Sequence, residues 1–308
     1  FLGLNSFDGL LTNIATHRYI AAAMHYGSVP DKLKVERYSK HVVNNIDAVV
    51  NFFGEKGHPV YLFDHSMGNV YFMIMDREYD RLKGIKQYLK GRIGANPFFG
   101  SEAKHSVIGF LDNVILPSLS MTKNPIEKSL FRGFRSFVPL DSKNGVRKRG
   151  INLTDMLIRR DSAMRNRVWR AMKKQIVYLM TNMDSLPHLN RVPIERALNR
   201  LPAKLFVIQI YSALLESKGF DDKEGYPNME KNKIPILMLK SERDCIAKFV
   251  PRFHIGSNVD ILDVTNPDEE DLFKEHLYHM VFQKETIEII ENFIEKVEAT
   301  SIVDELID

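Results

Sequence analysis

The stretch Val60-Tyr61-Leu62-Phe63-Asp64-His65-Ser66-Met67-Gly68-Asn69 decides the fold of this chain. A β-branched and aromatic run ends abruptly at Ser66, and an apolar segment with helical spacing follows from Val70 to Asp76. This change of texture predicts a strand, a sharp turn and a buried helix in direct succession. A serine on such a turn has its hydroxyl pushed out above the end of the sheet.

The same turn makes a demand on the neighbours of Ser66. Because the turn is tight, the residues two before and two after the serine need to be small. Gly68 meets this requirement, whereas Asp64 violates it and brings a carboxylate close to the turn. An isolated serine before Met-Gly is structural more often than catalytic, so the chemistry depends on what else the chain offers.

Hydrophobic periodicity elsewhere predicts an α/β fold. An amphipathic helix precedes the first strand, three further strands follow it, and a helix closes the chain. The predicted ranges are Tyr38 to Phe53 for the first helix, Gly91 to Ala95, Ile234 to Leu239 and Val259 to Val264 for the strands, and Thr286 to Val297 for the closing helix. Alternation of helices and strands implies a mostly parallel sheet that helices cover on both faces.

The composition changes between the predicted strands at Gly91 to Ala95 and Ile234 to Leu239. Basic residues and helix-like spacing dominate there, which predicts a helical, basic cap domain over residues 99–231, inserted into a core of residues 1–98 and 232–308. The segment from Arg132 to Lys174 contains thirteen Lys and Arg residues and three acidic residues, which gives it a net charge of +10. An anionic partner and a solvated helix face explain this charge equally well.

Composition is that of an ordinary soluble protein, with 308 residues, 44% of them hydrophobic and 27% charged, and a net charge of +4. The single cysteine, Cys245, rules out an internal disulfide. No run approaches the roughly 18 apolar residues of a membrane span. We expect a cytoplasmic protein with peripheral membrane contact. Because the chain begins at Phe1 rather than methionine, a targeting signal upstream of it stays open.

Three side chains at strand ends fit one chemistry. A serine hydroxyl becomes a good nucleophile when a base takes its proton, and that base is usually a histidine held by a carboxylate. Asp244 follows the strand that begins at Ile234, and His276 follows the last strand, with His279 close behind as an alternative base. The order of serine, acid and histidine along the chain matches a known arrangement.

These segments resemble those of the α/β-hydrolase superfamily. Asp64 to Asn69 resembles the G-H-S-M-G-G elbow of monoacylglycerol lipases and lysophospholipases, and His276 to His279 resembles their histidine loop. Ile234 to Asp244 resembles the segment that presents the acid. The resemblance covers the two core segments and implies an α/β-hydrolase fold in which the inserted region acts as a lid.

The resemblance also implies roles for individual residues. Ser66 corresponds to the nucleophile, His276 to the general base and Asp244 to the residue that orients it. The backbone N–H of Met67 corresponds to one oxyanion donor. The second donor would be the N–H of Leu4, in a segment that lacks the histidine usual in the family.

The resulting expectation is a serine hydrolase of carboxylic esters that needs no cofactor and no metal. Lipid-like esters, as for a lysophospholipase or monoacylglycerol lipase, are the expected substrates, and an anionic membrane surface is an expected partner. Asp64 and Asn69 depart from the small residues of the family elbow, which favours an alternative, a catalytically impaired binding protein. Nucleic acid is not an expected partner, because no recognised binding motif is present.

Overall fold

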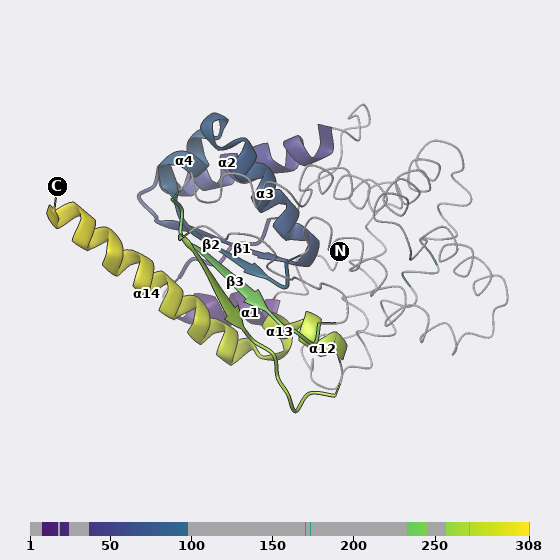
Figure 1. The fold of residues 1–308 in the computed structure, drawn as a ribbon. Coiled ribbons are helices and arrows are strands. Elements are labelled where there is room, and N and C mark those ends of the chain that lie inside the picture. The colour runs from purple at the N-terminus through teal and green to yellow at the C-terminus, as the bar shows by residue number, and fades with distance from the viewer. Residues whose placement is uncertain are drawn as a thin grey trace. The chain divides into compact units, whose positions relative to one another are not determined.

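We describe the fold from a computed structural model, which covers Arg170, Lys173 and residues 8–17, 19–24, 37–97, 233–244, 257–270 and 272–307 (Figure 1). The chain divides into two compact units, residues 1–38 with 101–219 and residues 39–100 with 220–308. Helix α1, Asp8–Thr16, belongs to the first unit. The predicted cap, residues 99–231, lies outside the described residues apart from Arg170 and Lys173, so its boundaries stay a prediction.

The second unit contains a parallel four-stranded sheet, so the predicted α/β class is confirmed. Its strands lie in the order β1-β2-β3-β4, and each pairs in parallel with the next. Their bounds are Val60–His65 for β1, Leu89–Ala95 for β2, Ile236–Lys240 for β3 and Val259–Asp263 for β4. All four predicted strands are therefore present, with their carboxyl ends at one edge of the sheet.

Helices occupy most of the remaining described chain of this unit. A 3-10 turn, η3 at Ser66–Gly68, joins β1 directly to the buried helix α3. The helical elements are α2 at Tyr38–Gly54, α3 at Asn69–Arg77, η4 at Tyr79–Arg81, α4 at Lys83–Tyr88, α12 at Leu272–His276, α13 at Tyr278–Val281 and α14 at Gln283–Ile307.

Residues of β2 show that α3 and α14 pack on opposite faces of the sheet. Successive residues of a strand point to alternate faces, so Gly91 and Gly94, three residues apart, lie on opposite faces. A Cβ atom at Gly91 would lie 2.9 Å from the ring of Phe293 in α14, and one at Gly94 would lie 2.1 Å from Asn69 Oδ1 in α3. Glycine at position 94 therefore allows the start of α3 to approach the strand closely.

A buried ion pair also joins α3 to β2. The Arg92 guanidinium lies 2.5 Å from Asp76 Oδ1 and donates a second hydrogen bond to the carbonyl oxygen of Phe72 at 3.1 Å. Both charged side chains are 1% exposed. Because charges this deep need a partner, the pair fixes α3 against the strand that ends beside the predicted site.

The closing helix is longer than the sequence pattern predicts. Its apolar face carries Ile287, Ile290, Phe293, Ile294 and Val297, all buried. Ile289, which the apolar spacing also predicts to face inward, is partly exposed. The helix then continues to Ile307, because residues 298–307 contain neither proline nor glycine to end it. Of the helices that the structure describes, none has both the length and the apolar character needed to cross a membrane.

Candidate active site

Ser66 lies at the sharp turn between β1 and α3, as predicted. It follows the last residue of β1 and begins η3, with a backbone φ of 52°. A positive φ is unusual for a residue with a side chain and stores strain that the surroundings must hold in place. The Ser66 side chain is partly exposed at the carboxyl edge of the sheet.

Asp64 fits beside this turn because Gly68 leaves room for it. A Cβ atom at Gly68 would lie 2.6 Å from Asp64 Oδ1, closer than real Cβ atoms approach an oxygen. The crowding expected from Asp64 is thus relieved at Gly68, whose missing side chain leaves space for the carboxylate.

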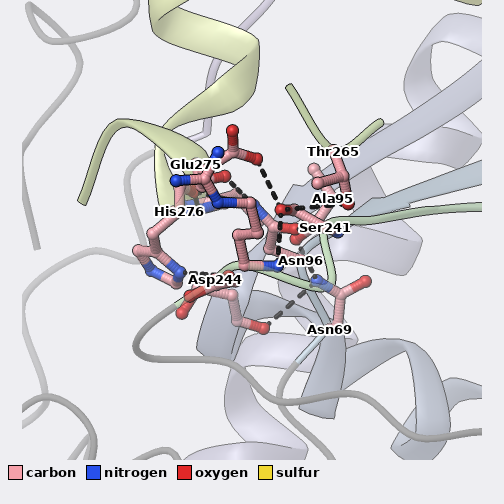
Figure 2. A network of polar contacts seen from close by, with 11 residues as sticks. Asn69, Ala95, Asn96, Ser241, Asp244, Thr265, Glu275 and His276 are labelled. Atoms are coloured by element: carbon pink, nitrogen blue, oxygen red, sulfur yellow. Dashed lines mark hydrogen bonds and ion pairs between the residues drawn. The ribbon is translucent and has the colours of Figure 1, made fainter. Parts of the chain in front are cut away.

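Asn69, the second departure from the family pattern, ties the turn to the neighbouring strand. Its Nδ2 donates to the carbonyl oxygens of Ser66 at 3.1 Å and Ala95 at 3.2 Å. Ala95 ends β2, and the Asn69 side chain is fully buried (Figure 2). Asn69 therefore supports the backbone of Ser66 in its strained conformation.

Asp244 and His276 form a buried hydrogen-bonded pair. Asp244 lies in the turn after β3, His276 ends α12, and His276 Nδ1 is 2.8 Å from Asp244 Oδ2 (Figure 2). The Asp244 side chain is 0% exposed and the His276 side chain 7%. A carboxylate only accepts, so Nδ1 carries the hydrogen and, in the neutral ring, Nε2 keeps its lone pair. That is the tautomer of a general base.

His65 is a close neighbour of this pair. Its ring centroid lies 4.6 Å from that of His276, and its Nε2 lies 2.7 Å from the His276 carbonyl oxygen. Since a carbonyl oxygen only accepts, Nε2 of His65 carries a hydrogen. Burial, and then repulsion from His279 and His276, lower the pKa of His65 well below 6.5, which keeps the ring neutral.

His279, the alternative base, lies deeper in the fold. Its side chain is fully buried, with its ring centroid 4.2 Å from that of His65 and 5.6 Å from that of Phe63. Burial, and then repulsion from His276, lower the pKa of His279 to about 3. His279 is therefore neutral at ordinary pH and packs as an aromatic core residue.

The remaining predicted contacts are less complete. His65, the residue before Ser66, contacts the His276 ring with its own ring. Within the described ranges, no hydrogen bond joins the Ser66 hydroxyl to the His276 ring. Such bonds are often long without substrate and tighten when it binds. Met67 lies in η3, directly after Ser66, and Leu4 lies outside the described residues.

Three polar residues that the sequence did not identify surround the pair. Asn96, Ser241 and Glu275 are all buried, at 2%, 4% and 0% exposure. Asn96 and Ser241 each follow a strand directly, and Glu275 precedes His276. Their positions at strand ends and beside a candidate base were the available signal. The described residues contain no cluster of three or more His, Cys, Asp or Glu that could hold a metal ion.

Comparisons with known proteins add little to this geometry. No protein-family model matches the sequence, and no curated protein matches it. Among solved structures, the fold is similar to a malate-bound thermophilic esterase from Thermogutta terrifontis, with a TM-score of 0.44 and 11% identity. That match covers 88% of this chain and 75% of the esterase chain.

Proposed function

We propose that this protein is a serine hydrolase that cleaves carboxylic esters through an acyl-enzyme. The observation that carries the proposal is the buried 2.8 Å hydrogen bond between Asp244 and His276 Nδ1. It makes Nε2 of His276 the nitrogen that can accept a proton, at the sheet edge where Ser66 stands on its strained turn. His276 is assigned as the base in preference to His279, because the bonded carboxylate would stabilise its imidazolium form.

The proposed reaction has two halves. In the first, Ser66 Oγ attacks the ester carbonyl carbon while His276 Nε2 takes the hydroxyl proton, and the N–H of Met67 donates to the oxyanion. Collapse of this intermediate releases the alcohol, which receives the proton from His276. In the second, a water molecule gives its proton to His276 and attacks the acyl carbon, and collapse of the new intermediate releases the acid while His276 returns the proton to Ser66 Oγ.

Hydrolysis of p-nitrophenyl acetate tests the proposal directly. Ser66→Ala should lower kcat by about 10⁶-fold. Asp244→Asn should lower it by about 10⁴-fold, because the amide favours the wrong tautomer of His276. Equal rates for the wild type and both variants, with all three proteins folded by circular dichroism, would refute the assignment.

A finer proposal concerns the substrate. We propose lipid-like esters, such as lysophospholipids or monoacylglycerols, and contact with an anionic membrane surface. The support is the net charge of +10 between Arg132 and Lys174. Rates on p-nitrophenyl esters from acetate to palmitate, and on lysophosphatidylcholine, should rise with acyl length. Preference for acetate with no lipid turnover would leave a small-ester esterase, and absence of co-sedimentation with anionic vesicles would remove the membrane contact.

A second candidate function is a binding protein on the same scaffold with impaired catalysis. The position of Asp64 against Gly68 favours it, because a carboxylate beside the turn would repel the negative charge that develops on the oxyanion. This candidate predicts saturable binding of a non-hydrolysable ester analogue by folded protein without turnover of the corresponding ester. Turnover that Ser66→Ala abolishes would exclude it.

A further inference from the structure

Neither member of the Asp244–His276 pair stands on a long, rigid element. Asp244 lies in a turn four residues after the end of β3, and His276 is the last residue of the five-residue helix α12. A displacement of about 1 Å in a reacting group lowers rates by about 10²-fold. Some other feature must therefore hold the two segments in register.

Asn96 joins the end of β2 to the end of α12. Its Nδ2 donates to the carbonyl oxygens of Glu275 at 2.7 Å and His276 at 2.9 Å, which uses both amide hydrogens. Carbonyl groups in the last turn of a helix have no partner within it, so these two bonds cap α12. Asn96 has a backbone φ of 43°, a conformation that asparagine tolerates better than most residues.

The same side chain reaches the segment that bears Asp244. Asn96 Oδ1 accepts a hydrogen bond from the backbone N–H of Ser241 at 3.2 Å, and the Asn96 N–H donates to the carbonyl oxygen of Leu239 at 2.8 Å. Asn96 thus contacts the acid segment and the histidine segment at once (Figure 2).

Ser241 and Glu275 make a second link between the two segments. The Ser241 hydroxyl donates to Glu275 Oε2 at 2.5 Å and accepts the N–H of Arg243 at 3.2 Å, next to Asp244. Glu275 Oε1 accepts the N–H of Asn266 at 3.0 Å. A buried carboxylate is tolerated only where donors satisfy it, so these bonds hold Glu275, and with it His276, in one position.

We propose that Asn96, Ser241 and Glu275 form a polar clamp that positions the Asp244–His276 pair for catalysis. The three are positioning residues, since they act on the pair through backbone and loop contacts. The proposal rests on the proposed hydrolase function for its catalytic consequence, but the geometry of the pair can be measured without turnover.

Asn96→Asp is the sharpest test, because it keeps the size of the side chain and the acceptor for Ser241 but removes the donors to the two carbonyl groups. Its matched control is Asn258→Asp. Asn258 donates from Nδ2 to the carbonyl oxygen of Ile234 at 2.7 Å, at the amino ends of β3 and β4, away from the Asp244–His276 pair. We expect kcat on p-nitrophenyl acetate to fall by about 10²-fold in Asn96→Asp, with KM nearly unchanged, and to stay near wild type in the control.

The second measurement is the tautomer of His276, read from ring ¹⁵N chemical shifts and assigned with His276→Gln. The wild type and Asn258→Asp should show hydrogen on Nδ1, and Asn96→Asp should lose this preference. Ser241→Ala supplies an uncharged variant should Asn96→Asp not fold, and Ser241→Thr, which retains the hydroxyl, should restore both the rate and the tautomer.

The outcomes separate the clamp from the function. An inactive wild type whose Nδ1–H tautomer is lost in Asn96→Asp or Ser241→Ala would keep the clamp and overturn the hydrolase. An active wild type whose rate and tautomer are unchanged in both variants would keep the hydrolase and overturn the clamp. A wild type without the Nδ1–H tautomer would also overturn the clamp.

Discussion

At the scale of single residues, the turn at Ser66 can hold the Asp64 side chain because Gly68 has no side chain to occupy the same space. The sequence pattern indicated that Asp64 violates the demand for a small residue. It could not indicate that the carboxylate occupies the space a side chain at position 68 would fill, because that depends on how the strand and the turn fold back on each other. The requirement for small size is thus shared between the two positions.

Gly68→Ala should therefore destabilise the protein, because its methyl group would lie 2.6 Å from Asp64 Oδ1. We expect a loss of about 1–3 kcal/mol in the free energy of unfolding, measured in urea. In the double variant Asp64→Ala/Gly68→Ala, most of this loss should disappear. Strictly additive effects of the two substitutions would show that the two positions do not compete for space.

At the scale of secondary-structure elements, the contact between α3 and β2 carries the site. Asn69 at the start of α3 bonds to Ala95 at the end of β2, and Asp76 near the end of α3 pairs with Arg92 in the middle of β2. The order β1, turn, α3 was predictable from the switch in hydrophobic period at Ser66. The ion pair of Arg92 with Asp76 was not predictable, because charged residues are usually exposed and no local pattern marks the exceptions.

Breaking that pair on one side should be costly. Asp76→Ala leaves the Arg92 guanidinium buried without its carboxylate, and we expect the free energy of unfolding to fall by about 3–5 kcal/mol. Replacing both residues, as in Arg92→Met/Asp76→Leu, should recover most of this loss, because no uncompensated charge remains buried. Urea unfolding of the three proteins measures both effects. A double variant as unstable as Asp76→Ala would contradict this explanation.

At the scale of the whole molecule, the four strands and the main helices of the sheet unit were predictable, because their apolar periods are regular and uninterrupted. The clamp was not predictable. Asn96, Ser241 and Glu275 are common polar residues, and the bonds that join them to one another and to His276 link residues 34 to 180 positions apart in the chain. Only the folded sheet, which brings the carboxyl ends of its strands to one edge, gives them a shared role.

The stability of the molecule should fall in acid because of its buried histidines. Folded His279 stays neutral down to a pKa of about 3, whereas in the unfolded chain it takes up a proton near pH 6.5. Between these values the unfolded state binds more protons, so stability decreases as pH falls. His65, whose pKa is also lowered, acts in the same direction.

This effect can be measured as the free energy of unfolding in urea at pH 7 and pH 5. His279 should account for a loss of about 2 kcal/mol over this interval. His279→Phe keeps an aromatic ring beside Phe63 and removes the titrating group, so its loss should be smaller than that of the wild type by this amount. Equal losses in the two proteins would show that His279 is not held neutral by burial.

The central claim, that Ser66 is an activated nucleophile, is tested most directly by a fluorophosphonate probe. The probe forms a covalent bond to a serine hydroxyl that a neighbouring base activates. We predict labelling of the folded wild type at Ser66, located by mass spectrometry of the labelled peptide, and no labelling of Ser66→Ala or of heat-denatured protein. Folded wild type that stays unlabelled under conditions that label a working lipase, or a label on another residue, would contradict the claim.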